Sequence, residues 1–148
     1  MKKTICVDFD GVLADYTQGW HGVDHFGDPI PGAVEFTKEL SKFAEVVVFT
    51  CRCSGDLHSG LAPHLLTNAV RAYLDKHGFE YASVYAGTGK PIASAYIDDR
   101  AIFCDPQHGG KLLSPQQIYK HTIERAKEFC HVEQDDGEDT TVPAASAV

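Results

Sequence analysis

Short apolar, strand-like runs alternate with stretches of helical periodicity along most of this chain, and this alternation restricts its fold most. The strand-like runs cover residues 3–8, 45–50, 82–85 and 95–97, and a very short fifth run covers residues 101–104. Apolar positions recur at a three-to-four spacing in residues 33–43 and 63–77, which predicts helices between these runs. Such an alternation predicts an α/β fold in which helices cover a mostly parallel central sheet on both faces. We therefore expect a three-layer, Rossmann-like architecture.

The C-terminal part of the chain divides into a helix and a polar segment. A capping box, Ser114-Pro115-Gln116-Gln117, marks the start of the helix. Residues 133–139 then carry five acidic residues and no basic one, a composition typical of disorder. The chain of 148 residues suits a single folded domain. We predict one domain over residues 1–131 and a disordered acidic tail over residues 132–148.

The charge and cysteine content bear on partners and compartment. The net charge of −8 disfavours binding to nucleic-acid phosphates, which needs clustered Lys and Arg. Five of the acids lie in the predicted tail, which weakens that argument for the rest of the chain, so a nucleic-acid partner stays open. Because no apolar run reaches about 18 residues, we expect no membrane span. The five Cys form no recognisable disulfide framework, which favours a cytoplasmic protein.

Acidic and hydroxyl side chains follow three of the predicted strands. Asp8 and Asp10 come at the end of the first strand, Thr50 ends the second, and Asp98-Asp99 follow the fourth. Parallel sheets bind ligands at the carboxyl ends of their strands. Two carboxylates at such short spacing repel each other and shift each other's pKa values, unless a cation lies between them. Mg²⁺ suits this pattern, since proteins bind it through one or two carboxylates, waters and a phosphate.

A candidate phosphate clamp completes this set. Lys90 lies in the sequence Gly87-Thr88-Gly89-Lys90-Pro91, where it can supply the positive charge that a transferring phosphoryl group needs. The hydroxyl of Thr50 can donate a hydrogen bond to the same anion. Together with the carboxylates, these residues predict phosphoryl transfer through a covalent aspartyl phosphate.

In this order, with Asp-x-Asp-Gly-Val-Leu at residues 8–13, the pattern resembles the haloacid dehalogenase superfamily of phosphotransferases over residues 3–104. The resemblance implies the fold of that superfamily and a Mg²⁺-dependent phosphomonoester hydrolase. It implies that Asp8 is the nucleophile and that Asp10 is the general acid and base. Thr50 and Lys90 would hold the phosphoryl oxygens. Asp8, the backbone carbonyl of Asp10, and Asp98 with Asp99 in support would bind Mg²⁺.

A longer match resembles the 5'-nucleotidase (deoxyribonucleotidase) branch of that superfamily. It comprises Val-Asp-Phe-Asp-Gly-Val-Leu-Ala-Asp at residues 7–15, Pro-Ile-Pro-Gly-Ala at 29–33 and Tyr-Ile-Asp-Asp at 96–99. Only fifteen residues separate Asp15 from Pro31, so the helical cap of that branch is missing here. We expect a minimal flap of residues 16–26, called the flap segment below, and no cap domain.

An uncapped site implies certain substrates and contacts. Such a site would take a large phosphorylated substrate, or a neighbouring subunit of a homo-oligomer would cover it; a small phosphorylated substrate also stays open. Within the flap segment, Trp20, His21 and His25 are candidate substrate contacts. Arg52 follows Thr50-Cys51 and is a candidate for contact with a substrate phosphate or base, or for a structural ion pair.

Three other functions stay open beside phosphate hydrolysis. A phosphoacceptor signalling domain also uses acids, a Thr and a Lys on a parallel sheet, although its phosphorylated Asp ends a middle strand. In this chain the second strand ends in Thr50 instead. A binding module without turnover would not need the complete acid set, and a phosphomutase usually needs a cap that excludes water.

Overall fold

The computed structural model describes residues 1–53, 62–87, 89–106 and 113–130. They belong to two compact units, Met1–Ala101 and Ile102–Val148. The predicted tail, residues 132–148, lies outside the described residues, and the domain boundary at residue 131 stays a prediction. Among the described helices, none combines the length and the apolar character that crossing a membrane requires.

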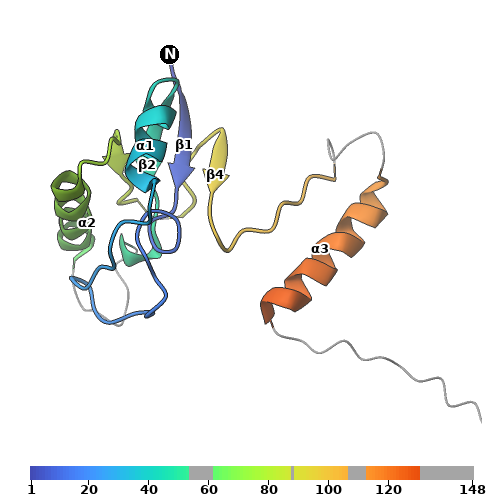
Figure 1. The fold of residues 1–148 in the computed structure, drawn as a ribbon. Coiled ribbons are helices and arrows are strands. Elements are labelled where there is room, and N and C mark those ends of the chain that lie inside the picture. The colour runs from blue at the N-terminus through green and yellow to red at the C-terminus, as the bar shows by residue number, and fades with distance from the viewer. Residues whose placement is uncertain (54–61, 88, 107–112, 131–148) are drawn as a thin grey trace, which may run out of the picture. The chain divides into compact units, whose positions relative to one another are not determined.

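The first unit is built on a parallel four-stranded sheet (Figure 1). Its strands are β1 (Lys3–Val7), β2 (Ala44–Val48), β3 (Ser83–Val84) and β4 (Ala95–Ile97). Their order in the sheet is β3-β2-β1-β4, and every neighbouring pair is parallel. The α/β class and the parallel sheet predicted from the sequence are confirmed. Because β1 lies between β2 and β4, the carboxyl ends of these three strands adjoin.

Two helices flank the sheet in the first unit. Helix α1 (Ala33–Ser41) packs against β2, and α2 (Pro63–His77) packs against β3 and the short 3₁₀ turn Cys51–Cys53. Helix α2 covers the predicted range 63–77, with Pro63 in its first turn and Gly78 as its C-cap. It buries the apolar face expected from its spacing, namely Leu66, Val70, Tyr73 and Leu74. Val70, Tyr73 and Leu74 of that face join Val46 and Val48 of the sheet in one hydrophobic core.

The segment between β1 and α1, residues 8–32, holds turns and two isolated β-bridges. All of these residues are described, and none forms a helix or a longer strand. Phe9 and Leu13 from this segment are completely buried, so its first part belongs to the core. The flap segment, residues 16–26, lies within this irregular stretch, and its role as a flap stays a prediction.

One predicted strand is absent. Residues 101–104 have no regular secondary structure, and the side chain of Phe103 is 85% exposed. These residues lie where the first unit ends and the second begins. An apolar, β-branched sequence forms a strand only where a neighbouring strand supplies hydrogen bonds and packing. The prediction of a strand over residues 101–104 is therefore wrong, because composition alone does not reveal a pairing partner.

The second unit contains α3 (Pro115–Cys130), which begins at the predicted capping box. The backbone N–H of Gln117 donates to Ser114 Oγ at 3.3 Å, and the backbone N–H of Ser114 donates to Gln117 Oε1 at 2.8 Å. Two N–H groups that the helix itself leaves unpaired are thereby satisfied. The capping box is confirmed.

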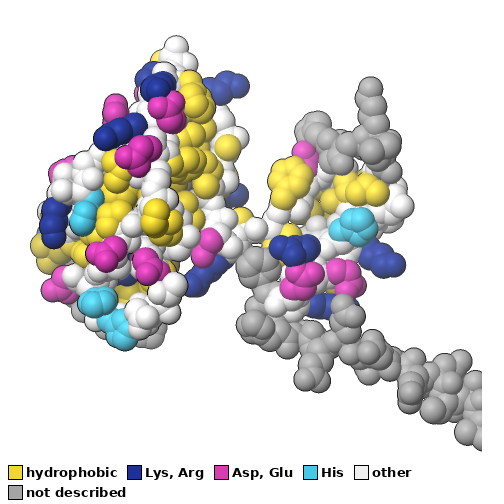
Figure 2. Space-filling view, viewed as in Figure 1, with side chains coloured by type: hydrophobic (Ala, Val, Ile, Leu, Met, Phe, Trp, Pro, Cys, Tyr) yellow, Lys and Arg dark blue, Asp and Glu magenta, His cyan; other side chains and the backbone are white. Residues whose placement is uncertain are grey.

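Acidic and basic side chains are interspersed over the face of the first unit that Figure 2 shows.

Cys6, Cys51, Cys53 and Cys104 are free thiols, and Cys6 and Cys53 are buried. Burial raises the pKa of Cys53 to about 11, so its thiol stays protonated near neutral pH.

Candidate active site

Asp8 lies at the carboxyl edge of the sheet, between the ends of two neighbouring strands. Its backbone N–H donates to the carbonyl of Ile97 at 2.8 Å, which extends the pairing of β1 with β4 by one residue. On the other side, the N–H of Phe49 donates to the carbonyl of Val7 at 2.9 Å and extends the pairing with β2. The backbone on both sides of the Asp8 side chain is therefore fixed by the sheet.

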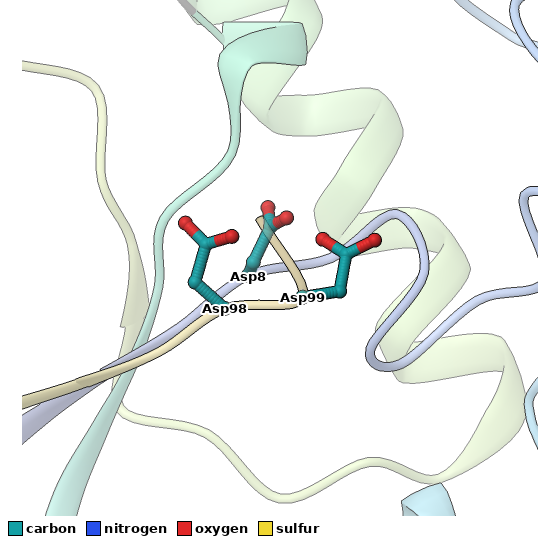
Figure 3. A group of neighbouring side chains, drawn as sticks. All are labelled: Asp8, Asp98 and Asp99. Carbon is teal, nitrogen blue, oxygen red and sulfur yellow. The ribbon is translucent and has the colours of Figure 1, made fainter. Parts of the chain in front are cut away.

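Asp98 and Asp99 bring two more carboxylates to the same edge. Together with Asp8, each offers an oxygen that lies within 4.8 Å of the others, and Figure 3 shows the three carboxylates pointing to the same side of the backbone. The backbone N–H of Arg100 donates to Asp98 Oδ1 at 2.7 Å and orients that side chain. We call Asp8, Asp98 and Asp99 the acidic cluster.

Gly11 allows the turn after β1 to approach this cluster. Its φ of 82° is a left-handed conformation that strains other residues, and its N–H donates to the carbonyl of Ala14 at 2.9 Å. A Cβ atom at this position would lie 2.5 Å from Asp99 Oδ2. The Gly of the Asp-x-Asp-Gly motif is therefore needed both for the turn and for the position of Asp99.

The electrostatics of the acidic cluster favour a bound cation. The pKa of Asp8 is raised to about 7, mainly because burial disfavours its charged form and also because Asp98, Asp99 and Asp10 are close. A hydrogen bond from the N–H of Phe9 to Asp8 Oδ1 at 2.7 Å opposes this rise. A divalent cation among these oxygens would offset the repulsion and keep all three carboxylates ionised. Hard oxygen donors such as these suit Mg²⁺.

A cleft of about 320 Å³ lies beside the cluster. Its lining combines acidic, aromatic, basic and thiol side chains: Asp8, Asp10, Tyr16, Trp20, Phe49, Cys51, Asp98 and Arg100. Tyr16 and Trp20 come from the flap segment, so this segment forms one wall of the cleft. The volume lies in the range of small-molecule sites, roughly 300–1,000 Å³.

Asp10 lines the cleft but is paired within the protein. Its Oδ2 accepts a hydrogen bond from Arg52 Nε at 2.6 Å, and both side chains are largely buried. Its Oδ1 is buried too and has no hydrogen-bond partner among the described residues. A buried carboxylate oxygen without a partner is costly, so this arrangement leaves one hydrogen-bond acceptor of Asp10 unsatisfied.

The structure describes Thr50 and Lys90, but neither is among the residues that line the cleft. The hydroxyl oxygen of buried Thr50 accepts a hydrogen bond from the backbone N–H of Arg52 at 3.2 Å. Lys90 is exposed, with its Nζ 4.2 Å from the centre of the Tyr96 ring. The predicted contacts of both residues with phosphoryl oxygens stay predictions.

Of the three candidate substrate contacts in the flap segment, Trp20, His21 and His25, only Trp20 is among the described residues that line the cleft. Trp20 lines the cleft, whereas His21 and His25 are exposed and lie against each other with ring centres 5.2 Å apart. His21 Nε2 is 2.7 Å from the carbonyl oxygen of Gln18.

Sequence reasoning missed four lining residues: Tyr16, Phe49, Cys51 and Arg100. Phe49 and Cys51 flank Thr50, and Arg100 follows Asp99 directly. A search that included the neighbours of strand-end residues would have found these three. Tyr16 is placed by the path of the flap segment, which has no periodic pattern.

Comparisons of the chain with protein-family models, with curated proteins and with solved structures found no match. A functional argument therefore rests on the residues and their geometry.

Proposed function

We propose that this protein is a Mg²⁺-dependent phosphomonoester hydrolase of the haloacid dehalogenase type, acting through an aspartyl phosphate on Asp8. The observation that carries the proposal is the acidic cluster at the carboxyl edge of the parallel sheet, beside a cleft of about 320 Å³. The order of Asp8, Asp10, Thr50, Lys90 and Asp98-Asp99 along the chain adds support. The cleft volume favours a small phosphorylated substrate.

The donors of the site suit the metal that this function requires. Asp8, Asp98 and Asp99 would hold Mg²⁺, with the backbone carbonyl of Asp10 as a further oxygen donor, as the resemblance implies. When bound, Mg²⁺ supplies positive charge that keeps the carboxylates ionised and stabilises charge on the phosphoryl oxygens. The raised pKa of Asp8 supports this part of the proposal, because it reports a local excess of negative charge and burial.

The chain's own residues would carry out two displacements at phosphorus. In the first, a carboxylate oxygen of Asp8 bonds to phosphorus, the ester P–O bond breaks, and the leaving oxygen takes a proton from Asp10. In the second, a water oxygen bonds to phosphorus and gives a proton to Asp10, while the bond between phosphorus and Asp8 breaks. The products are an alcohol and inorganic phosphate, and Asp8 and Asp10 return to their initial states. Because Oδ2 of Asp10 is paired with Arg52 and Oδ1 is buried, both proton transfers require a side-chain movement that exposes a carboxylate oxygen of Asp10 to the cleft.

A nucleoside monophosphate is the finer form of this proposal. Three aromatic side chains, Tyr16, Trp20 and Phe49, line the same cleft as the acids and can stack on a planar base. The similarity of residues 7–15 to the 5'-nucleotidase branch points the same way. A panel of nucleoside monophosphates and sugar phosphates tests this form: a preference for the nucleotides supports it, and equal or lower rates on them contradict it.

Hydrolysis of a generic aryl phosphate tests the proposed activity. We expect turnover with Mg²⁺ and loss of turnover when EDTA removes the metal. Asp8→Asn should lower kcat by at least about a thousandfold, because the amide cannot form the phosphorylated intermediate. The matched control is Asp75→Asn on α2, since Asp75 lines a different hollow, near the start of β3, and should leave the rate unchanged. Turnover by Asp8→Asn at the rate of the unmodified protein would exclude Asp8 as the nucleophile.

A phosphoacceptor domain without turnover is the second candidate, favoured by the pairing of Asp10 with Arg52 and by the exposed position of Lys90. Such a domain would accept one phosphoryl group from a small acyl phosphate onto Asp8 and keep it. Stoichiometric labelling without release of inorganic phosphate would support this candidate over a hydrolase.

A homo-oligomer that covers the cleft is a separate proposal about partners. Native mass spectrometry of the full chain would test it: a dimer or larger assembly supports it, and a monomer at assay concentration contradicts it.

A further inference from the structure

Arg52 is a buried cation next to the cleft. Its side chain is 4% exposed, and it lies in the 3₁₀ turn Cys51–Cys53 that follows β2. A buried guanidinium is tolerated only where ion pairs and hydrogen bonds replace its lost water. The partners of Arg52 therefore show what this charge does in the fold.

The polar partners of Arg52 lie on two segments of the cleft wall. Its Nε donates to Asp10 Oδ2 at 2.6 Å. Its Nη1 donates to the backbone carbonyls of Gly22 at 3.3 Å and His25 at 3.1 Å. Both carbonyls belong to the flap segment, so one planar group links the loop after β1 to the flap.

Aromatic rings surround the same guanidinium. Its central carbon lies 4.8 Å from the centre of the Trp20 ring, 4.9 Å from that of Phe26 and 5.9 Å from that of Phe9. Phe9 is completely buried in the core and contacts Phe26 edge-on, with ring centres 5.7 Å apart. The guanidinium therefore makes cation–π contacts both with Trp20 of the flap segment and with Phe9 of the core.

We infer that Arg52 is a positioning residue that holds the flap segment and Asp10 in place at the wall of the cleft. It acts through Trp20 and Asp10 and does not bind the substrate phosphate itself. Three features carry the inference: the hydrogen bond from Nε to Asp10, the two hydrogen bonds from Nη1 to flap carbonyls, and the aromatic contacts. Lys cannot replace this group, because an ammonium lacks both the planar face and the divergent N–H donors of a guanidinium. The importance of this arrangement for turnover rests on the proposed function, whereas the structural role does not.

The chain contains its own reporter for this role. Trp20 is the only tryptophan, so selectively excited fluorescence reports on the flap segment alone. In Arg52→Lys, the Trp20 emission should shift to longer wavelength, because the ring loses its contact with the guanidinium and becomes more exposed to water. Acrylamide quenching should rise by up to about twofold, because Trp20 is 48% exposed in the unmodified protein and full exposure would about double that fraction. Arg71→Lys on α2 is the matched control and should leave both quantities unchanged. Far-UV circular dichroism identifies any variant that fails to fold.

A second variant tests the same contacts while leaving Arg52 itself unchanged. Phe26→Leu retains the Arg52–Asp10 pair but removes one ring that packs on the guanidinium, so it should change Trp20 fluorescence in the same direction by a smaller amount. Unchanged emission and quenching of Trp20 in both folded variants would overturn the inference.

Inorganic phosphate distinguishes positioning from direct binding. If the protein is a phosphatase, the inhibition constant of phosphate should stay within about twofold in Arg52→Lys, because the inference gives Arg52 no contact with phosphate. Loss of phosphate inhibition with unchanged Trp20 fluorescence would show direct binding and overturn the inference. A fluorescence change in a protein without phosphatase activity would support the positioning role and contradict the proposed function, so the two can fail separately.

Discussion

Gly11 shows at the residue scale how a short motif becomes the geometry of a site. The sequence predicted that Asp8, Asp98 and Asp99 would meet, because each follows a strand of one parallel sheet, and the structure brings them together. The contact between Gly11 and Asp99 could not be predicted in the same way. It depends on the path of the turn after β1, and a sequence pattern states only that Gly permits such a turn.

Substitution of Gly11 tests this contact. Gly11→Ala should lower the free energy of unfolding by about 1–2 kcal/mol, since its φ of 82° strains a residue with a Cβ atom. It should also weaken Mg²⁺ binding, because the new methyl group displaces Asp99. Gly78→Ala is the matched control: its φ is 77°, but a Cβ there would have no neighbour within 4 Å among the atoms described. Equal loss of Mg²⁺ affinity in both variants would contradict the proposed contact.

Removal of one charge from the acidic cluster tests the role of repulsion. Without metal, Asp99→Asn should leave the protein as stable or raise its free energy of unfolding by up to about 1 kcal/mol, because exposed charges interact weakly. The unmodified protein should gain about 2.7 kcal/mol when Mg²⁺ is present at a hundred times its dissociation constant. This gain should shrink strongly in Asp99→Asn and persist in Asp75→Asn, as measured by urea unfolding with and without Mg²⁺. A full Mg²⁺ gain in Asp99→Asn would argue that the cluster does not bind the metal.

At the scale of elements, the sequence pattern predicted the helix and strand boundaries that depend on local sequence. The boundaries of α2, the capping box of α3 and the range of β4 agree with the sequence prediction, and β1, β2 and β3 differ from it by one or two residues at their ends. The fifth strand at residues 101–104 was wrong because no local pattern shows whether a run has a pairing partner. The burial of Arg52 was likewise beyond reach, since it depends on Trp20, Phe26 and Phe9 meeting in space.

Tyr73 connects α2 to the loop that follows the flap segment. Its hydroxyl donates to the carbonyl of Gly27 at 2.9 Å, and its ring contacts Phe9 edge-on with ring centres 5.0 Å apart. Tyr73→Phe keeps the ring and removes the hydrogen bond, so the free energy of unfolding should fall by about 1 kcal/mol. Tyr81→Phe, which removes an exposed bond to Asp75, should cost less than about 0.5 kcal/mol. Equal midpoints of urea unfolding for the two variants would show that the Tyr73 bond does not stabilise the fold.

At the scale of the whole molecule, the parallel sheet assembles the site from segments far apart in the sequence. Lining residues from the segments 8–20, 49–51 and 98–100 meet because β1 lies between β2 and β4, an order that only the structure shows. Much of the net charge of −8 can be assigned to two places in the chain. Three of the acids form one candidate metal site, and five belong to the segment 133–139. A bound divalent cation would therefore neutralise part of the charge that the sequence carries.

The most direct test of the central claim is to identify the phosphorylated residue. The protein would be mixed with Mg²⁺ and an aryl phosphate, quenched in acid during turnover and reduced with borohydride, which converts an aspartyl phosphate to homoserine. Peptide mass spectrometry then locates the modified position. We predict homoserine at position 8, with Asp10, Asp98 and Asp99 unmodified and no product from Asp8→Asn. Turnover without modification at position 8, or modification of another aspartate, would contradict the assignment of Asp8 as the nucleophile.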